Sequence, residues 1–386
     1  MAGRFSSSVL IAGGGLGGLC LAQGLKKAGI ASTVFERDVS PTSRLTGYRL
    51  SLTPDGFKAL HSCLPEALWK RALATATDQD EGIHFIGPDL SVRFFKQTPA
   101  AESESHRWGS ISRVSLREIL LEGLEDRVHF GKQVEGYEVL AEDTVRLRFS
   151  DGTSVEGASL VGADGTHSKI REQLMPESNR IDTGSAAIAA KVPYDAQTKA
   201  DYDPEPIVES AVVLDKAPQG LFLARHKIET RGMEDNYIFW SFLTPRQRLP
   251  QNLGSMSEEA LIALVDEMTP GFDERLKRLI RRGVPSSVQR LTYEASIRPK
   301  RWPAGPVTVL GDAVHNMPPT GGEGANMALK DGMVLTAALV DHFSNGRPLA
   351  DVLEDYETEM IEYAFNAVET SLFNLHRMIT REKKLG

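Results

Sequence analysis

The chain has 386 residues, which is too long for one ordinary core and suits two closely connected domains. Apolar residues make up 41% of it and charged residues 25%, so the composition is that of a folded protein and excludes extensive disorder. The net charge of −8 offers no general attraction for nucleic acid or anionic lipid, and two cysteines without a C-x-x-C pair indicate neither a disulfide framework nor a thiolate metal site. We therefore expect a cytoplasmic protein with no nucleic-acid, membrane or metal partner.

The first predicted elements form one βαβ unit. Ser8 to Ala12 is a buried strand, Leu16 to Ala28 is a helix that ends at Gly29, and Ser32 to Glu36 is a second strand. The uncharged run Val9 to Leu25 contains six glycines and lies at the short limit for spanning a bilayer, which favours a phosphate-binding turn over a membrane span.

The middle of the chain indicates two groups of strands. A helix is expected at Ser115 to Leu124, followed by short strands at Val128 to Phe130, Gly136 to Leu140, Thr144 to Phe149 and Leu160 to Ala163. Between about Leu174 and Ile297, alternating segments predict a separate sheet, with strands at Ala186 to Val192, Ala211 to Leu214, Leu221 to Ala224 and Tyr237 to Leu243, interrupted by a helix at Ser257 to Met268.

The last part of the chain returns to a buried strand and then becomes helical. The strand is expected within Pro303 to Leu310, and it ends at Gly311-Asp312. Asn326 to His342 and Leu349 to Ile379 are predicted as long amphipathic helices. The second helix can pack on its own domain or on another subunit, so the oligomeric state stays open.

A glycine motif lies between the first strand and the first helix. Gly13-x-Gly15-x-x-Gly18 lets the backbone turn sharply and approach a pyrophosphate, and the helix start offers free N–H donors. Glu36, at the end of the next strand, supplies the carboxylate that accepts bonds from ribose hydroxyls. The pattern predicts a dinucleotide site and by itself does not distinguish FAD from NAD.

Two further motifs change the interpretation. The first is Gly162-Ala163-Asp164-Gly165, and the second is Gly311-Asp312-Ala313 with the loop Pro318 to Asn326 after it. Together with Arg113-x-x-Leu116 at the start of a helix, they make the chain resemble, over nearly its whole length, the single-component FAD-dependent aromatic hydroxylases. That family includes para-hydroxybenzoate hydroxylase and the tetracycline-inactivating monooxygenases.

The resemblance implies roles for particular residues. Glu36 would hold the adenosine ribose, Arg113 the FAD backbone and Asp312 a ribityl hydroxyl, while Arg44 matches an arginine that contacts NADPH in the tetracycline-inactivating relatives. The predicted cofactor-binding residues are Gly13, Gly15, Gly18, Glu36, Arg37, Arg44, Ser51, Arg113, Asp164, Asp312, Pro319, Gly322, Gly324, Ala325 and Asn326.

The chain departs from this family at two places near the expected flavin. Relatives usually have Gly-Gln-Gly where this chain has Gly322-Glu323-Gly324, which adds a carboxylate unless the side chain points to solvent. The tetracycline-inactivating relatives have an Asp at the position of Ser51, so one polar contact to FAD is expected to differ. We expect His315 to be a packing or hydrogen-bonding residue of its loop and Asp331 to be structural.

Few side chains are expected to be obligatory for catalysis, because a flavin performs the difficult chemistry itself. The candidates are Arg49, on a strand expected to pass near the flavin, and Arg225, which would hold an anionic oxygen of the substrate. Four aromatic residues of the second sheet either wall an apolar cavity or pack as ordinary core: Phe222, Phe239, Trp240 and Phe242.

These observations predict an α/β fold with a discontinuous, Rossmann-like FAD-binding domain (residues 1–75, 105–173 and 297–345) interleaved with a β-sheet substrate domain (76–104 and 174–296), and with a long C-terminal helix (346–386). No second G-x-G-x-x-G is present, so NADPH or NADH is expected to bind transiently as a co-substrate. The absence of H-E-x-x-H and G-x-S-x-G patterns disfavours metal catalysis and a serine hydrolase.

The function implied by the resemblance is that of an oxidoreductase. NAD(P)H reduces FAD, O2 adds to the flavin C4a atom, and the resulting hydroperoxide oxygenates a small aromatic or polyketide-like substrate whose identity the sequence does not give. Two alternatives remain open: a redox-neutral flavoprotein such as a cyclase or isomerase, and a non-catalytic FAD-binding module.

Overall fold

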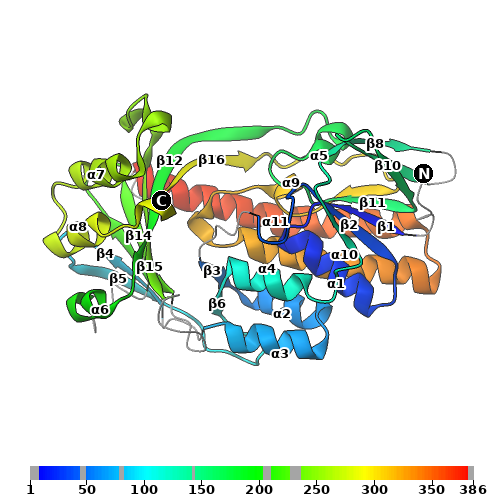
Figure 1. Ribbon diagram of the computed structural model, residues 1–386, viewed down its shortest axis with the longest axis horizontal. Helices are drawn as coiled ribbons and strands as arrows, with labels where there is room; N and C mark the ends of the chain where they lie inside the picture. Colours follow the sequence, from blue (N-terminus) through cyan, green and yellow to red (C-terminus); the bar gives the residue numbers. More distant parts are fainter. Residues whose placement is uncertain are drawn as a thin grey trace, which may run out of the picture.

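The computed structural model describes residues 8–43, 49–77, 82–140, 144–202, 210–226 and 236–380. A five-stranded parallel sheet, in the order β17-β11-β1-β2-β7, forms the centre of the larger part of the molecule (Figure 1). Its strands are β1 (Val9–Ala12), β2 (Ser32–Glu36), β7 (Val128–Phe130), β11 (Ser159–Gly162) and β17 (Val307–Val309). The predicted βαβ unit is confirmed, and β1 and β2 are buried along their whole length.

Helices cover one face of this sheet, and a small antiparallel sheet lies at its other side. The small sheet has the order β10-β9-β8 and consists of β8 (Val134–Val139), β9 (Val145–Phe149) and β10 (Ser154–Gly157). The helices of this part are α1 (Leu16–Lys27), α2 (Pro54–Cys63), α3 (Glu66–Thr75), α4 (Arg113–Leu121), α5 (Lys169–Leu174), α9 (Asp312–His315), α10 (Gly324–Asn345) and α11 (Leu349–Thr380).

Glycines let α1 and α10 approach each other closely. A Cβ atom on Gly24 would lie 2.4 Å from the Thr336 hydroxyl oxygen, and one on Gly17 would lie 2.8 Å from the Ala328 carbonyl oxygen. Because neither position has room for a side chain, the backbone of α1 packs directly against α10, on a carbonyl oxygen at Gly17 and on the Thr336 side chain at Gly24. The glycines of α1 therefore serve this packing as well as the turn before the helix.

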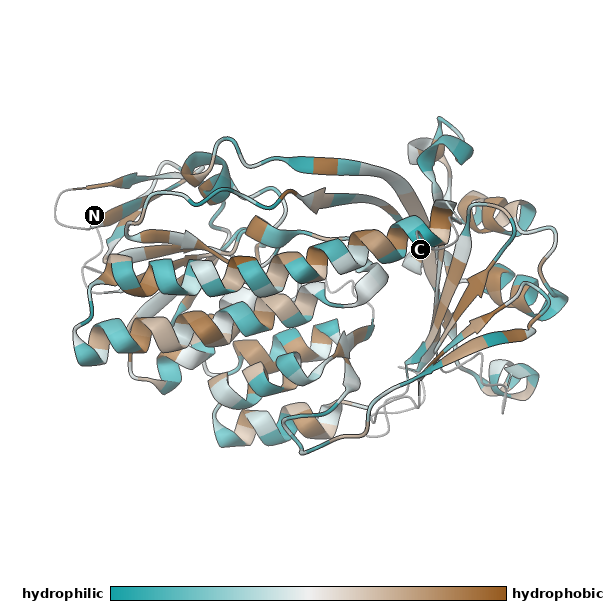
Figure 2. Cartoon of the chain, turned by 180° about the vertical axis from the view of Figure 1, so that it is seen from behind, coloured by the Kyte–Doolittle hydropathy of each residue, from teal (hydrophilic) through white to brown (hydrophobic). Residues whose placement is uncertain are grey.

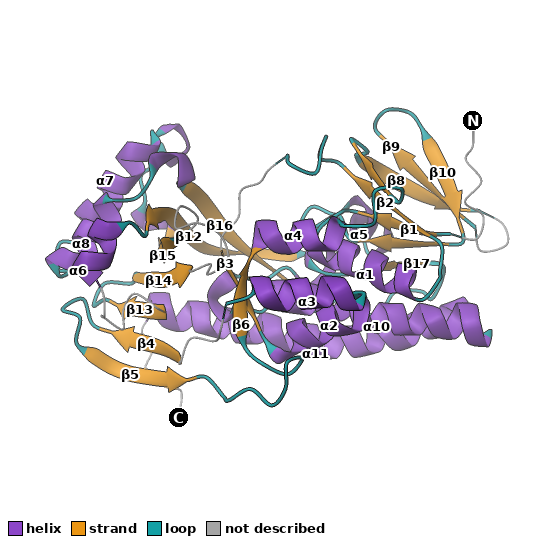
Figure 3. Ribbon diagram, turned by 60° about the horizontal axis from the view of Figure 1, so that its bottom comes forward, coloured by secondary structure: helices purple, strands orange, loops and turns teal. Residues whose placement is uncertain are grey.

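A seven-stranded sheet forms the second part of the molecule. Its order is β16-β12-β15-β14-β13-β4-β5, and all neighbours are antiparallel except β13 and β4. The strands are β4 (Gly82–Ile86), β5 (Val92–Gln97), β12 (Arg180–Pro193), β13 (Ser210–Leu214), β14 (Gly220–His226), β15 (Tyr237–Pro245) and β16 (Gln289–Ser296). A two-stranded sheet, β3 (Arg49–Leu52) with β6 (Gly109–Ser112), lies between the two parts (Figure 3).

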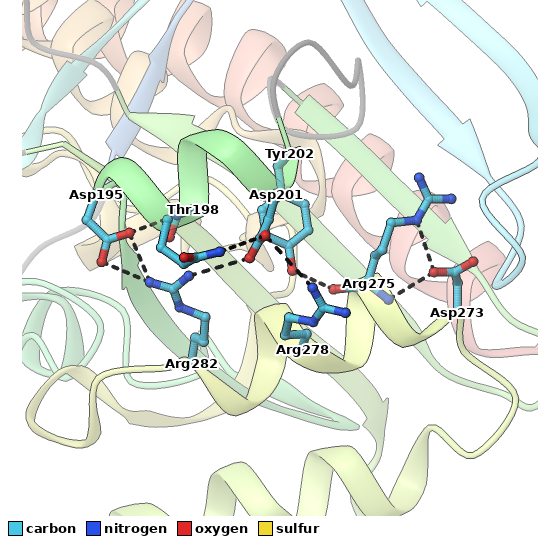
Figure 4. A network of polar contacts seen from close by, with 9 residues as sticks. Asp195, Thr198, Asp201, Tyr202, Asp273, Arg275, Arg278 and Arg282 are labelled. Carbon is cyan, nitrogen blue, oxygen red and sulfur yellow. Dashed lines mark hydrogen bonds and ion pairs between the residues drawn. The ribbon is translucent and has the colours of Figure 1, made fainter.

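Three helices cover the outer face of the seven-stranded sheet: α6 (Ala196–Tyr202), α7 (Glu258–Met268) and α8 (Glu274–Arg281) (Figure 3). Polar contacts join α6 to α8 (Figure 4). Arg282 donates to both carboxylate oxygens of Asp195, at 2.9 and 2.8 Å, and the Tyr202 hydroxyl donates to the Arg275 carbonyl at 2.7 Å. The inner face of the sheet is turned toward β3 and the end of α11.

The C-terminal helix α11 runs along the whole larger part and reaches the second sheet (Figures 1 and 3). Hydrophilic and hydrophobic bands alternate along α10 and α11 (Figure 2), as expected for amphipathic helices with one buried stripe. Near its end, Leu375 packs with Ala187, Leu243 and Tyr293 of the second sheet. Among the described residues, no helix has both the length and the apolarity needed to cross a bilayer.

The predicted fold class and both long helices are confirmed, with α11 ending one residue later than predicted. The predicted helix Ser115 to Leu124 begins and ends earlier, at Arg113 and Leu121, since Gly123 with φ +75° stops it. Strands β4, β5 and β16 and helix α8 were not predicted individually. The seven-stranded sheet takes strands from residues 82–97 and 180–296, and the domain boundaries themselves stay a prediction.

Candidate active site

The turn after β1 has the geometry of an anion cradle. Gly13 has φ +116°, and a Cβ atom there would lie 2.2 Å from the Ala163 carbonyl oxygen, so only glycine fits. Nothing lies within 4 Å of a Cβ atom built on Gly15, and no side chain caps the start of α1. The first N–H groups of α1 therefore have no side-chain acceptor among the described residues, which leaves them available to a pyrophosphate.

Glu36 is fixed beside this turn at the end of β2. Its side chain is buried, and its two carboxylate oxygens accept hydrogen bonds from the N–H groups of Gly14 (2.6 Å) and Asp38 (2.9 Å). Each oxygen keeps a lone pair for a further donor, which suits the predicted contact with ribose hydroxyls. The neighbouring Arg37 is exposed and has no hydrogen bond or ion pair among the described residues.

Two other predicted cofactor residues have side chains that contact no polar partner in the part of the chain that the structure describes. Arg113 is the first residue of α4 and Asp312 the first residue of α9; both are exposed, and within the described ranges neither makes a hydrogen bond or ion pair. Asp164 differs, because its carboxylate accepts hydrogen bonds from the Ser168 hydroxyl and the Lys169 N–H at the start of α5. Arg44 lies outside the described residues. The cofactor contacts of all four stay predictions.

The 318–326 loop is held against β3 by one buried side chain. The Asn326 Oδ1 atom accepts from the Thr53 N–H at 3.0 Å, and its Nδ2 atom donates to the carbonyls of Ser51 (2.9 Å) and Gly322 (3.0 Å). Asn326 was predicted to bind the cofactor, but all of these side-chain bonds are internal, so the side chain acts as a brace. Its predicted contact with FAD stays a prediction.

The remaining loop residues give the loop its shape. Pro319 begins a short 3-10 helix (η7, Pro319–Gly321), and Gly322 follows with φ +70°, a left-handed conformation that favours glycine. Helix α10 then begins at Gly324 with no side-chain cap, so the N–H groups of its first turn, including that of Ala325, give a partial positive charge at this end. The exposed Ser51 lies next to the loop, 3.8 Å from the position of a Cβ atom on Gly322.

Glu323 does not extend freely into solvent. Its side chain is partly buried, and this burial, together with the nearby Asp55 carboxylate, raises the pKa of Glu323 above the ordinary value, while Lys330 and Lys96 act in the opposite direction. Lys330 forms an ion pair with Asp55 at 3.1 Å. The carboxylate at this departure from the family pattern therefore belongs to the charged surroundings of the loop.

Arg49 and Arg225 lie next to each other, but the contact joins the Arg49 side chain to the Arg225 main chain. The Arg49 guanidinium donates to the main-chain carbonyl of Arg225 at 3.1 Å. The Arg225 guanidinium donates to the Tyr194 hydroxyl at 3.2 Å, and strand alternation places it on the outer face with Leu221 and Leu223. This position does not favour the predicted contact between Arg225 and a substrate on the inner face.

The four aromatic residues considered from the sequence divide between the two faces of the sheet. Trp240 and Phe242 are fully buried under α7 and α8, where they are ordinary core. Phe222 and Phe239 lie on the inner face, are only partly buried, and pack edge to face with ring centroids 6.2 Å apart. Trp240 and Phe242 thus follow the alternative of ordinary core packing, and Phe222 and Phe239 remain as candidates for an apolar wall.

The inner face also carries a cation that the sequence reading missed. Lys191 lies directly opposite Phe239 across β12 and β15, so the two side chains share this face. The Lys191 Nζ atom lies 4.5 Å from the ring centroid of Tyr237, and partial burial lowers the pKa of Lys191. The signal was present as a single lysine in the otherwise apolar run Ala186 to Val192.

Helix α11 sets the position of the 318–326 loop relative to this face. The Thr320 hydroxyl donates to the Ser371 carbonyl at 2.6 Å, and Leu375, which packs on the sheet, follows one helical turn later. The four residues from Ser371 to Leu375 span about 6 Å at a rise of 1.5 Å per residue. The loop therefore lies next to the inner face, and this connection through α11 was not predicted from the sequence.

Comparison with known proteins identifies the family. The model of the FAD-binding domain family matches residues 6–371. The chain belongs to this family. It is 31% identical to a dual O-methyltransferase/FAD-dependent monooxygenase of Cercospora beticola over 92% of this chain, but spans only 44% of that protein's length. It is 29% identical to the FAD-dependent urate hydroxylase of Klebsiella oxytoca, covering 91% of this chain and 85% of the relative.

A solved structure agrees with this assignment. A protein of Photorhabdus luminescens, provisionally described as a FAD-containing monooxygenase, superposes with a TM-score of 0.88 at 30% identity over 98% of this chain and all of its own. The resemblance inferred from the motifs is therefore confirmed. The glycine turn, with its open approach and uncapped helix, and the unbonded side chains of Arg113 and Asp312 fit a bound FAD.

Proposed function

We propose that this member of the FAD-binding domain family is a monooxygenase that consumes NADPH or NADH and O2 and hydroxylates a small aromatic or polyketide-like molecule. The observation that carries the proposal is the position of the 318–326 loop, which Asn326 fixes to β3 and which lies next to the partly uncovered inner face of the second sheet. A flavin along this loop would face a substrate on the sheet.

The chain's own groups would hold the cofactor from one end to the other. The N–H groups at the start of α1 would bind the pyrophosphate, Glu36 the ribose, and Arg113 and Asp312 the chain that leads to the flavin. Bound FAD would supply the redox chemistry, accepting a hydride from NAD(P)H and activating O2. The N–H groups at the start of α10 would stabilise negative charge at the edge of the reduced ring.

The inner face would orient the substrate and exclude water. Phe222 and Phe239 offer an apolar surface for an aromatic ring. Lys191 and Arg49 offer positive charge at one side of that surface, where an ionised phenol or enol oxygen would be stabilised, so that the carbon to be oxygenated becomes electron-rich. We therefore include in the proposal a catalytic role for Arg49 and a role for Lys191 in stabilising the oxyanion of the substrate.

The decisive experiment is an absorbance spectrum of the purified protein, followed without oxygen after NADPH is added, with and without a panel of phenolic and polyketide-like compounds. Flavin bands that bleach faster with one compound, and an oxygenated product after air is admitted, are the expected result. Flavin bands that do not bleach in the presence of any of the compounds would favour the redox-neutral alternative. A protein that takes up no FAD would contradict the cofactor assignment as well.

A further inference from the structure

The fully buried carboxylate of Asp331 connects α10, on which it lies, with three other segments. Asp331 of α10 is inaccessible to solvent and accepts three hydrogen bonds: from the Gly311 N–H at 2.7 Å, from the His315 Nε2 atom at 2.6 Å and from the Tyr363 hydroxyl at 2.6 Å. The donors lie on the turn after β17, on α9 and on α11. A carboxylate removed from water needs such partners, and charge-assisted bonds of this kind are the strong ones.

Among the described residues, only this carboxylate forms a hydrogen bond with the imidazole of His315. His315 is fully buried, and its Nδ1 atom has no hydrogen-bond partner among the described residues. Burial by itself lowers the pKa of His315, but the adjacent Asp331 carboxylate, with a smaller contribution from the Asp312 carboxylate, leaves the pKa above its ordinary value. The ring is therefore fixed as an ion-pair partner of Asp331, which agrees with the structural roles expected for both residues.

One oxygen of Asp331 holds both ends of a one-turn helix. Its Oδ2 atom accepts from Gly311, the residue before α9, and from His315, the last residue of α9. Four residues are too few to form a stable helix unaided, since the first turn fixes several residues for a single hydrogen bond. Gly311 also has φ +63°, a conformation that needs external support.

Asp312 lies between the two clamped residues. It is the first residue of α9, its carboxylate is exposed, and no described residue bonds to it. The direction of this carboxylate depends on the backbone of Gly311 and on the course of α9, and Asp331 fixes both. We propose that Asp331, His315 and Tyr363 are positioning residues that hold Asp312 ready for a hydroxyl of the FAD polyol chain, so that α11 contributes to cofactor binding through Tyr363.

This inference rests on the FAD site of the proposed function, and the chain offers a matched pair of tyrosines to test it. Tyr356 and Tyr363 lie two turns apart on α11; the Tyr356 hydroxyl donates to the Val309 carbonyl at 3.0 Å and not to Asp331. Tyr363→Phe and Tyr356→Phe each remove one hydroxyl. FAD affinity of the apoprotein is measured by quenching of flavin fluorescence, and the melting temperature of the apoprotein is measured beside it.

We expect Tyr363→Phe to weaken FAD binding on the order of tenfold, because one hydrogen bond to a charged group is lost from the clamp. Tyr356→Phe should lower the melting temperature of the apoprotein about as much as Tyr363→Phe does. Its FAD dissociation constant should stay within about twofold of the wild-type value. Equal changes of affinity in both variants, or no change in either, would overturn the proposal.

A double-mutant cycle separates positioning from general loosening. If Tyr363 acts through Asp312, then Tyr363→Phe in an Asp312→Ala background should change FAD affinity by less than about twofold. Fully additive effects would refute the route through Asp312. As a second variant of the clamp, His315→Gln keeps an N–H donor and should bind FAD more tightly than His315→Ala; equal weakening by the two would contradict the role of the His315 bond.

These outcomes are distinct from failure of the proposed activity. The affinities need no NAD(P)H oxidation, so the positioning role stands or falls even if no substrate is ever turned over. A wild-type protein that binds no FAD would overturn both the positioning role and the proposed function, whereas wild-type binding with an unchanged Tyr363→Phe variant would overturn the positioning role alone.

Discussion

Replacement of Asn326 tests how the loop of the active site is held. In the Asn326→Ala variant, the buried Thr53 N–H loses its acceptor, which costs about 1–3 kcal/mol. The other two bonds go to carbonyls of the exposed residues Ser51 and Gly322, where water can take over, so we count about 0.5–1 kcal/mol for each. The free energy of unfolding should therefore fall by about 2–5 kcal/mol.

The assay is equilibrium urea unfolding of the apoprotein, followed by tryptophan fluorescence, together with a titration of FAD. Asn345→Ala is the matched control, because Asn345 lies on the same helix, is exposed, and donates only to Asp341 at 2.8 Å. We expect the control to change the unfolding free energy by less than about 0.5 kcal/mol. FAD affinity should fall in Asn326→Ala, since the loop loses its attachment to β3.

A change in FAD affinity without a change in stability would contradict the role of Asn326 as a brace. An Asn326→Ala apoprotein as stable as the wild type, but with weakened FAD binding, would mean that the side chain contacts the cofactor directly and is not a brace. An Asn326→Asp variant gives a second test: it keeps the acceptor for Thr53 but places negative charge against two carbonyl oxygens, so its stability should fall at least as far.

Three further predictions follow from the geometry. Asp312→Ala should weaken FAD binding by about 1–3 kcal/mol in a fluorescence titration, and unchanged flavin occupancy would show that the cofactor is misplaced. Because the folded state raises the pKa of Glu323, the native protein binds this proton more tightly than the unfolded chain, and the resulting stability is lost as pH rises from the ordinary glutamate pKa through the raised one. A Glu323→Gln variant should lose this pH dependence of the melting temperature. The same pH dependence in both proteins would contradict the burial argument. Trp240→Ala should lower the free energy of unfolding by about 3–5 kcal/mol and leave FAD affinity unchanged, because this side chain is fully buried. Phe222→Ala should lower the stability less but reduce substrate-stimulated NADPH oxidation, because this side chain is only partly buried. The reverse pattern would mean that the two faces of the sheet are wrongly assigned.

Several features of the fold could be predicted because they depend on neighbours in the sequence. The turn Gly13 to Gly18, the strand that ends at Glu36 and the long helices α10 and α11 follow from local spacing of glycines and apolar residues. The family could be recognised for the same reason, since each of its motifs is a short continuous segment.

Other features depend on contacts between distant segments, for which the sequence had no comparable signal. Residues 82–97 join a sheet whose other strands lie about a hundred residues later in the chain. Packing in the folded protein decides that they pair with β13 at one edge of this sheet. Alternation along β15 shows that Phe239 and Trp240 point to opposite faces, but only the helices packed on one face reveal which residue is core.

The family, the glycine turn after β1 and the set of candidate FAD-binding residues could be predicted from short motifs, because such motifs fix backbone shape wherever they occur. The contacts that each side chain makes became visible only in the folded structure. Asn326 proved to be a brace, the Arg225 guanidinium lies on the outer face, and Tyr363 reaches the clamp around Asp312 from α11. The physical reason is that hydrogen-bond partners and burial are properties of three-dimensional neighbours, and these residues find theirs more than thirty positions away or on another element.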